Sequence, residues 1–369
     1  MIRVLVVDDS ALARKLFTNV LAAEPDFEVR SARDGLEALA LVHSFRPDVV
    51  TLDVHMPKMD GLACLDRIII ERPCPVVMVS SLTAEGADAT LEALRLGAVD
   101  FVAKPEGVVS LGMETFAPRL VEKVRAAASA RVRSSLRLKE RVLHRTSRPR
   151  LQDHSTSEVT LEVRGGINRP SAQGDGLVLV GVSTGGPTAL EALLTPLPKN
   201  FPWPILIAQH MPASFTGALA KRLDDLCALQ VVEVRRPTPL EPGYAYIGRG
   251  EADLIVGRRA AGLVAMAAPE RASYPWHPST DRLVRSAMEH LPASQLIGVL
   301  MTGMGNDGAE AMTELLKRGG RTIAQSEDTS VVWGMPGELV RAGGAEWVEP
   351  LDRIADRLVE IAPRHAAHS

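Results

Sequence analysis

Short apolar runs alternate with amphipathic stretches along the first 130 residues. The apolar runs lie within residues 2–7, 27–32, 47–57, 74–81 and 98–105. The stretches between them carry apolar residues three and four positions apart, as helices do, and a last helix is expected near residues 118–130. Five strand–helix units of this kind predict a parallel sheet covered by helices on both faces. The functional site should then lie at the carboxyl ends of the strands.

The same alternation returns in the second half of the chain. Strands are expected within residues 176–183, 203–210, 229–237, 244–250, 296–305 and 321–326. Helices are expected within residues 187–197, 214–226, 279–291, 308–319 and 351–362. The pattern predicts a second α/β domain with a doubly wound parallel sheet, with no detectable sequence repeat of the first.

The stretch between the two halves is irregular and basic. Residues 119–150 hold eleven Lys or Arg and two Asp or Glu, which gives this stretch a net charge of +9. Because the net charge of the whole chain is −3, the remaining residues together carry −12. A basic stretch can bind nucleic acid, but this one has no aromatic residues and no zinc or helix-turn-helix spacing. We therefore expect a solvated linker and no nucleic-acid partner. The predicted division is 1–122, a linker at 123–175, and 176–366.

The composition is that of an ordinary globular protein, with 46% hydrophobic and 24% charged residues. No apolar run approaches the roughly 18–20 residues of a membrane span, and the N-terminal run turns acidic too early for a signal peptide. Cys64, Cys74 and Cys227 form no CxxC motif. These features predict a cytoplasmic protein without membrane insertion.

Acidic residues end two strands that the first sheet would place side by side. Asp8 and Asp9 follow the first strand and Asp53 ends the third, while Ser80 and Lys104 end the next two. Crowded carboxylates repel one another and offer the oxygen ligands that Mg²⁺ prefers. A carboxylate, a metal, a fixed cation and a hydroxyl around one point favour phosphoryl transfer onto the carboxylate.

The segments VLVVDDS, DVVTLDVHMPKMDGL, VVMVSS and DFVAKP resemble the receiver domain of two-component response regulators. The resemblance implies a flavodoxin-like fold, with Asp53 as the phosphoacceptor and Asp8, Asp9 and Asp53 as the Mg²⁺ site. It further implies that Lys104 contacts the phosphoryl group and that Ser80 and Phe101 form the switch pair. His55 stands where the family uses a backbone carbonyl for the metal, so its imidazole is incidental.

The loop GVSTGG places Ser183 after a predicted strand and before a predicted helix. It fits the G-x-S-x-G pattern of an exposed serine and lacks the glycine spacing of dinucleotide or P-loop sites. Taken alone the motif is weak, and a tight turn is its default explanation. His210 and Asp307 also follow predicted strands, so the three side chains could meet in one cleft.

In such a cleft His210 would take the proton of Ser183, and Asp307 would orient the imidazole. The glycine-rich turn TGMGNDG could direct backbone N–H groups at an oxyanion. The chain order Ser, His, Asp differs from that of α/β-hydrolases, so the serine loop does not assign that fold.

The second half resembles the catalytic domain of the CheB family of chemotaxis protein-glutamate methylesterases. The segments that carry the likeness are GVSTGGPTAL, AQHMPASFTGALAKRLD, YPWHPSTDRL, LMTGMGNDGAEAM and AQSEDTSVVWGMP. The resemblance implies a Rossmann-like domain that needs no cofactor, with Ser183, His210 and Asp307 as the catalytic triad. It also implies the Met304 N–H as an oxyanion donor, with Thr184 and the segment around His277 beside the cleft.

Two alternatives concern individual residues of this half. His277 is a rival for the role of general base, although it stands in a proline-rich, loop-like stretch. Met301, Met304 and Met335 could suggest a sulfur-rich metal site, but core packing and backbone roles explain them better, and no Cys/His cluster has zinc spacing.

The two resemblances together imply a response regulator with an esterase output. A histidine kinase would phosphorylate Asp53, and the second domain would then hydrolyse glutamate methyl esters, and deamidate glutamines, on methyl-accepting chemoreceptors. We expect the unphosphorylated receiver to cover the catalytic cleft. A DNA-binding regulator, a noncatalytic adaptor and a nucleotide-binding Rossmann-like domain are the alternative functions.

Overall fold

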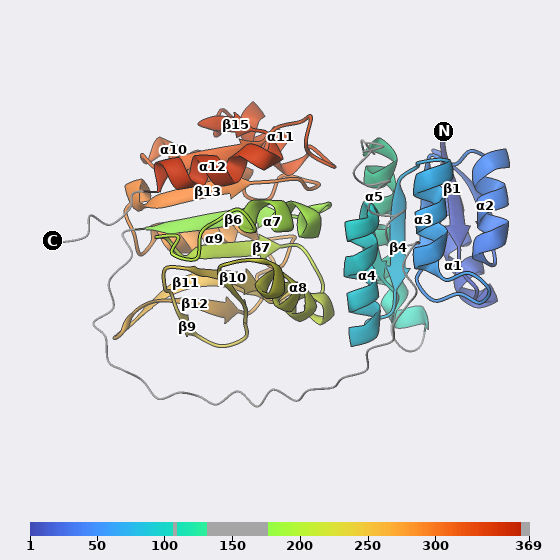
Figure 1. Cartoon of the computed structure of the whole chain (residues 1–369), viewed down its shortest axis with the longest axis horizontal. Coiled ribbons are helices and arrows are strands. Elements are labelled where there is room, and N and C mark those ends of the chain that lie inside the picture. Colours follow the sequence, from blue (N-terminus) through green and yellow to red (C-terminus); the bar gives the residue numbers. More distant parts are fainter. Residues whose placement is uncertain (106–108, 131–175, 363–369) are drawn as a thin grey trace.

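The computed structural model describes residues 1–105, 109–130 and 176–362, which form two α/β domains (Figure 1). The N-terminal domain has a parallel sheet with strand order β2-β1-β3-β4-β5. Its strands are β1 (Ile2–Val7), β2 (Phe27–Ala32), β3 (Val49–Asp53), β4 (Val76–Ser80) and β5 (Asp100–Ala103). Its helices are α1 (Ala11–Ala22), α2 (Gly35–Ser44), α3 (Gly61–Glu71), α4 (Ala84–Leu96) and α5 (Val109–Ser129). The predicted five-unit sheet is confirmed.

Local sequence explains where these elements begin. Strands β3 and β4 are buried at every position, because helices cover both faces of the sheet. Four helices start at a residue whose side chain accepts a hydrogen bond from a backbone N–H of the first turn: Ser10, Asp34, Asp60 and Thr83. Such caps satisfy donors that the helix leaves unpaired.

The last helix of this domain differs from its predicted extent. Helix α5 begins at Val109 rather than near residue 118, carries Pro118 inside, and continues to Ser129. The helical state of residues 123–129 agrees with the helix expected near 118–130, so the domain boundary predicted after residue 122 falls inside α5. The remaining linker at 131–175 and the end of the predicted second domain at 363–366 lie outside the described residues.

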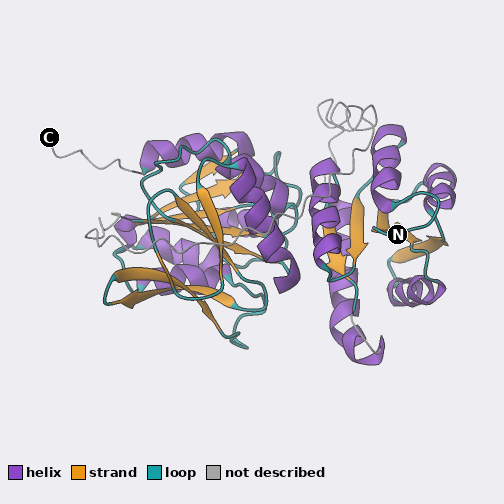
Figure 2. Ribbon diagram, turned by 60° about the horizontal axis from the view of Figure 1, so that its bottom comes forward, coloured by secondary structure: helices purple, strands orange, loops and turns teal. Residues whose placement is uncertain are grey.

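The C-terminal domain has a seven-stranded parallel sheet of order β15-β14-β13-β6-β7-β10-β8. These strands are β6 (Leu177–Val182), β7 (Ile205–Gln209), β8 (Gln230–Val234), β10 (Tyr244–Gly248), β13 (Leu296–Leu300), β14 (Arg321–Gln325) and β15 (Trp347–Glu349). Its helices are α7 (Gly186–Leu194), α8 (Ala213–Leu226), α9 (Thr280–Met288), α10 (Ala309–Lys317), α11 (Met335–Arg341) and α12 (Leu351–Ile361), with a short 3₁₀ turn η1 (Ala293–Gln295). Helices cover the sheet on both faces (Figure 2).

Our sequence reading missed a small antiparallel sheet in this domain. Strands β11 (Asp253–Arg259) and β12 (Gly262–Ala268) form a hairpin, and β9 (Thr238–Pro239) pairs with β12. Gly262 follows the hairpin turn with a φ of 127°, a conformation that favours glycine. The segment was overlooked because it interrupts the strand–helix alternation on which the prediction relied. Strand β15 and helix α11 were also missed.

The two domains contact each other through one side of the receiver-like domain. Helices α4 and α5 lie toward the C-terminal domain in Figure 1, and α4 packs against α7 and α8. Phe101 of β5 packs against Phe215 of α8 with ring centroids 4.4 Å apart and ring planes tilted by 41°. Buried residues of the two domains belong to one continuous apolar cluster. None of the described helices has the length and apolar character needed to cross a membrane.

Candidate functional site

The predicted acidic cluster forms at the carboxyl ends of β1 and β3. These strands pair in parallel, so Asp8 and Asp9 come to lie beside Asp53. Each of the three offers a carboxylate oxygen, and these oxygens lie within 4.8 Å of one another. Lys104 Nζ lies 2.8 Å from Asp53 Oδ2 and 2.9 Å from Asp8 Oδ2.

The donor set of this cluster fits a hard divalent cation. Asp8 Oδ2 is buried and accepts no hydrogen bond among the described residues, although Lys104 is near. Burial and the Asp8 carboxylate raise the pKa of Asp53 against the opposing effect of Lys104. Burial alone would lower the pKa of Lys104, but the two carboxylates outweigh it and raise that pKa. Excess negative charge in a buried place is what a Mg²⁺ ion would relieve.

Three further residues that the sequence analysis named belong to this domain: His55, Ser80 and Phe101. The backbone N–H of His55 points at Asp53 Oδ1 over 3.4 Å, while its imidazole is exposed. Ser80 is buried, and its hydroxyl donates to the Gly86 carbonyl of α4 at 3.1 Å. In this structure Ser80 is therefore engaged with α4, and Phe101 is engaged with the other domain.

Ser183 follows β6 and precedes α7, as predicted. Its N–H donates to the Thr302 carbonyl at 3.0 Å, and its carbonyl accepts from Gly186 N at 2.8 Å. Gly185 in this turn has a φ of 77°, and a Cβ there would lie 2.7 Å from Val331 Cγ2, so the turn requires glycine. A Cβ at Gly303 would lie 2.7 Å from Ser183 Cβ, which places the glycine-rich loop after β13 against the serine.

Strand pairing brings His210 next to Ser183. Val182 pairs with Gln209, so the residues that follow them emerge side by side at the end of the sheet. The His210 N–H donates to the Val182 carbonyl at 3.1 Å. The buried amide of Gln209 ties the two loops together, because its Nε2 donates to the carbonyls of Ser183 and His210, each at 3.1 Å.

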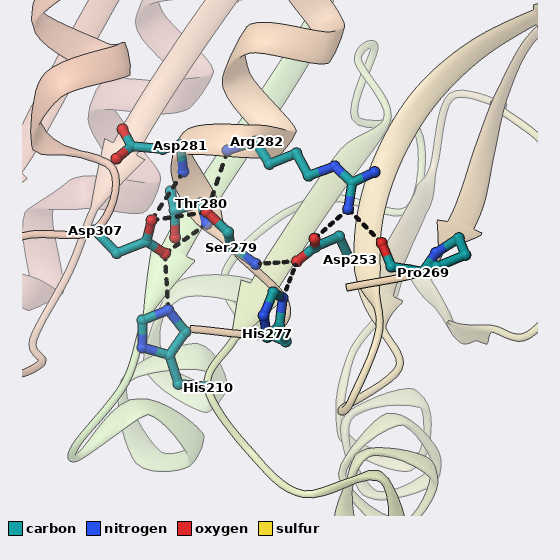
Figure 3. A network of polar contacts seen from close by, with 9 residues as sticks. All are labelled: His210, Asp253, Pro269, His277, Ser279, Thr280, Asp281, Arg282 and Asp307. Atoms are coloured by element: carbon teal, nitrogen blue, oxygen red, sulfur yellow. Dashed lines mark hydrogen bonds and ion pairs between the residues drawn. The ribbon is translucent and has the colours of Figure 1, made fainter. Parts of the chain in front are cut away.

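His210 and Asp307 form a close pair (Figure 3). The distance from His210 Nε2 to Asp307 Oδ2 is 2.9 Å. His210 Nδ1 is buried and has no hydrogen-bond partner among the described residues. The imidazole is thus oriented by the carboxylate through one nitrogen and can exchange a proton through the other.

Asp307 is held by the N-terminus of α9. Its oxygens accept from the Ser279 hydroxyl at 2.9 Å and from the N–H groups of Thr280 at 2.6 Å and Asp281 at 3.1 Å. Burial acts to raise the pKa of Asp307, but the bond from His210 and these backbone donors lower it below its usual range. Helix N-termini stabilise negative charge in this way. The carboxylate is therefore held ionised.

His277, the rival base, belongs to a different pair. Its Nδ1 lies 2.9 Å from Oδ1 of Asp253, which is fully buried and also bonded to Arg282. The methionines do not gather as a metal site would require: Met301 and Met335 are buried among core residues, while Met304 lines a cleft between the domains.

Thr184, beside the serine, touches the N-terminal domain. Its hydroxyl donates to Asp100 Oδ2 at 2.5 Å, and both residues are buried. Lys123 pairs with the other oxygen of Asp100 at 2.7 Å. A cleft of about 880 Å³ lies between the domains and is lined by residues of α5 and of the end of α1 together with Met304 and Val332.

Two domain families match this chain. Residues 178–358 match the CheB methylesterase domain, and residues 4–112 match the response regulator receiver domain. A protein-glutamate methylesterase/protein-glutamine glutaminase of Rhodopseudomonas palustris is 56% identical over 370 residues, which cover 100% of both chains. The chain belongs to the CheB methylesterase family. A relative of the same description from Rhodospirillum rubrum is 52% identical, covering 97% of this chain and 95% of its own.

A third family member, from Caldanaerobacter subterraneus, is 44% identical and covers 100% of this chain and 98% of its own. Membership of the CheB family and the presence of the two domains confirm the resemblances drawn from the motifs. Sequence reasoning missed Gln209, Asp253 and Asp100, which take part in the contacts described above. Only Gln209 had a signal, as a polar residue ending a buried apolar strand next to His210.

Proposed function

We propose that this protein is a protein-glutamate methylesterase, and a protein-glutamine glutaminase, whose esterase domain is activated by phosphorylation of its receiver domain. The substrates are the glutamate methyl esters and glutamines of methyl-accepting chemoreceptors, and the phosphodonor is a histidine kinase. The observation that carries the proposal is the His210–Asp307 pair at 2.9 Å, at the same sheet end as the Ser183 loop.

The residues divide the ester hydrolysis among them. Ser183 Oγ attacks the ester carbonyl carbon while its proton passes to His210 Nδ1, the nitrogen left free by Asp307. The negative charge that develops on the carbonyl oxygen is met by the Met304 N–H. Collapse of the intermediate breaks the bond to methoxide, which leaves as methanol with the proton from His210. Water then hydrolyses the acyl-serine by the same route, releasing glutamate.

In the receiver domain Asp53 accepts the phosphoryl group. Asp8, Asp9 and Asp53 would hold Mg²⁺, which neutralises charge on the transferring group when bound. Lys104 is within reach of the same oxygens and would pair with the phosphoryl group. The esterase chemistry itself uses only amino-acid side chains and backbone donors.

The receiver restrains the esterase by contact. Asp100 holds Thr184, next to the nucleophile, and Phe101 of the switch pair lies on Phe215. Both contacts come from β5, which ends one residue before Lys104. Phosphorylation of Asp53 would draw Lys104 and Ser80 toward the new charge, shift β5, and loosen these contacts. Interfaces between domains of one chain resemble transient protein–protein interfaces, so contacts of this kind can be released by a change in one domain.

The test is release of methanol from methylated receptor by the full-length protein, with acetyl phosphate and Mg²⁺ present. We expect Ser183→Ala to abolish the release, because no other group supplies the attacking oxygen. Ser294→Ala is the matched control, since Ser294 is exposed on the short 3₁₀ turn of the same domain. Full activity of Ser183→Ala would refute the enzymatic proposal and favour an adaptor.

A further inference from the structure

The segment between β12 and α9 contacts His210, the proposed general base, through Trp276. The Trp276 ring lies on the His210 ring with centroids 5.9 Å apart and planes only 3° from parallel. The indole also reaches the oxyanion turn, because a Cβ at Gly305 would lie 2.8 Å from Trp276 Cζ2. Gly305 has a φ of 76° and directly follows Met304. One indole therefore borders both the base and the residue next to the oxyanion donor.

The backbone that carries Trp276 is anchored to a fully buried carboxylate. His277 Nδ1 and Ser279 N lie 2.9 and 2.8 Å from Asp253 Oδ1. Arg282 pairs with the other oxygen of Asp253 and with the Pro269 carbonyl. Because His277 is the immediate neighbour of Trp276, these bonds fix the backbone from which the indole extends (Figure 3 shows the bonds of His277 and Asp253).

Ser279 connects Asp253, which holds the Trp276 segment, to Asp307, which holds His210. Ser279 donates its N–H to Asp253 and its hydroxyl to Asp307 Oδ1 at 2.9 Å. The two carboxylates are therefore fixed relative to each other through the N-cap of α9. The positions of the His277 segment and of Asp307 are therefore coupled through this one serine.

We propose that Trp276 is a positioning residue for the esterase reaction: its indole fixes the plane of the His210 ring, whose Nδ1 is left free by Asp307, and supports the turn that carries the Met304 N–H. The inference rests on the proposed function. Asp307 fixes only one ring nitrogen, so the imidazole can still tilt about that bond, and a parallel aromatic surface limits the tilt. The same π face favours the imidazolium that forms when His210 takes the proton.

The test compares Trp276→Leu and Trp276→Met with Trp276→Phe in the full-length protein, activated with acetyl phosphate and Mg²⁺. Methanol release is measured over a range of methylated-receptor concentrations. We expect kcat to fall about 10–100-fold in the Leu and Met variants with KM nearly unchanged, as misplacement of a reacting group does. Trp276→Phe keeps a flat ring and should restore most of kcat. Trp347→Leu, which removes an indole from β15, is the control.

A second readout is independent of receptor binding. A fluorophosphonate reacts with Ser183 Oγ, which forms a bond to phosphorus as fluoride leaves and His210 takes the proton. The labelling rate should fall in parallel with kcat in the Leu and Met variants. The Met variant keeps an unbranched apolar side chain, so a result is available even if the Leu variant fails to fold.

Two outcomes would overturn the inference. A raised KM with unchanged kcat and labelling would make Trp276 a substrate contact instead, and wild-type behaviour of all three variants would leave it without a role. Ser183→Ala separates this inference from the function on which it rests. If Ser183→Ala is inactive while Trp276→Leu is normal, only the role of Trp276 is wrong; if Ser183→Ala is active, the proposed function fails as well.

Discussion

Asp53, the last residue of β3, and Asp307, in the loop between β13 and α10, are both buried carboxylates, yet their surroundings differ. Asp307 accepts from four donors at 2.6–3.1 Å, three of them at the start of α9 and one from His210. Asp53 has Lys104 at 2.8 Å and one long backbone contact, with two other carboxylates beside it. The pKa of Asp307 is accordingly lowered and that of Asp53 raised.

The difference separates two uses of the same chemical group. A carboxylate whose lone pairs are all taken is a poor nucleophile, but it can orient an imidazole and stabilise its charged form. A carboxylate with few donors and repulsive neighbours keeps a lone pair for attack on phosphorus, and it recruits the cation that the reaction needs. The donor count around each aspartate, rather than its burial, thus indicates its role.

For the two aspartates, the largest expected effect is the loss of ester hydrolysis in Asp307→Asn. The amide cannot hold His210 in the correct tautomer, and loss of a triad aspartate costs on the order of 10⁴-fold in kcat. Methanol release from methylated receptor measures it. The control is Asp352→Asn, an exposed acid at the start of α12. A loss below tenfold would mean that Asp307 does not orient the base.

A smaller effect is expected in Asp53→Asn, because this change leaves the esterase residues in place. The basal rate of methanol release should stay near that of the unphosphorylated wild type, while stimulation by acetyl phosphate and Mg²⁺ should disappear. Asp88→Asn, on an exposed position of α4, should be stimulated normally. Continued stimulation of Asp53→Asn would show that another residue accepts the phosphoryl group.

The smallest effect concerns stability against pH. Because the pKa of Asp307 is lower in the folded chain than its usual 3.8, ionised Asp307 stabilises the fold above that pH, and this contribution is lost as pH falls through the lower folded pKa. Asp307→Asn should cost about 2 kcal/mol of unfolding free energy at pH 7, and the difference should narrow below pH 3.8.

Urea unfolding followed by tryptophan fluorescence checks this prediction, since all four tryptophans lie in the C-terminal domain. A difference between wild type and Asp307→Asn that is the same at pH 7 and below pH 3.8 would contradict the assigned pKa shift.

The prediction from sequence succeeded where local pattern and strand order decide the outcome. Alternation of apolar runs with helical stretches is a property of neighbouring residues, so the parallel sheets and the residues at their carboxyl ends followed from it. The prediction from sequence failed for the β11–β12 hairpin, because its antiparallel strands interrupt the alternation of strands and helices. The extent of α5 was also misjudged, because Pro118 is accommodated inside the helix.

By itself the sequence determined the two α/β domains, the acidic cluster with Lys104, and the presence of a serine, a histidine and an aspartate at strand ends. The pairing of His210 with Asp307 was expected from the sequence, and the tertiary structure gives its distance. Only the tertiary structure revealed the pairs of His277 with Asp253 and of Thr184 with Asp100 across the domain boundary. Sequence spacing constrains residues on one element, whereas these pairs join segments 24 to 97 positions apart, and packing of separate elements sets their distances.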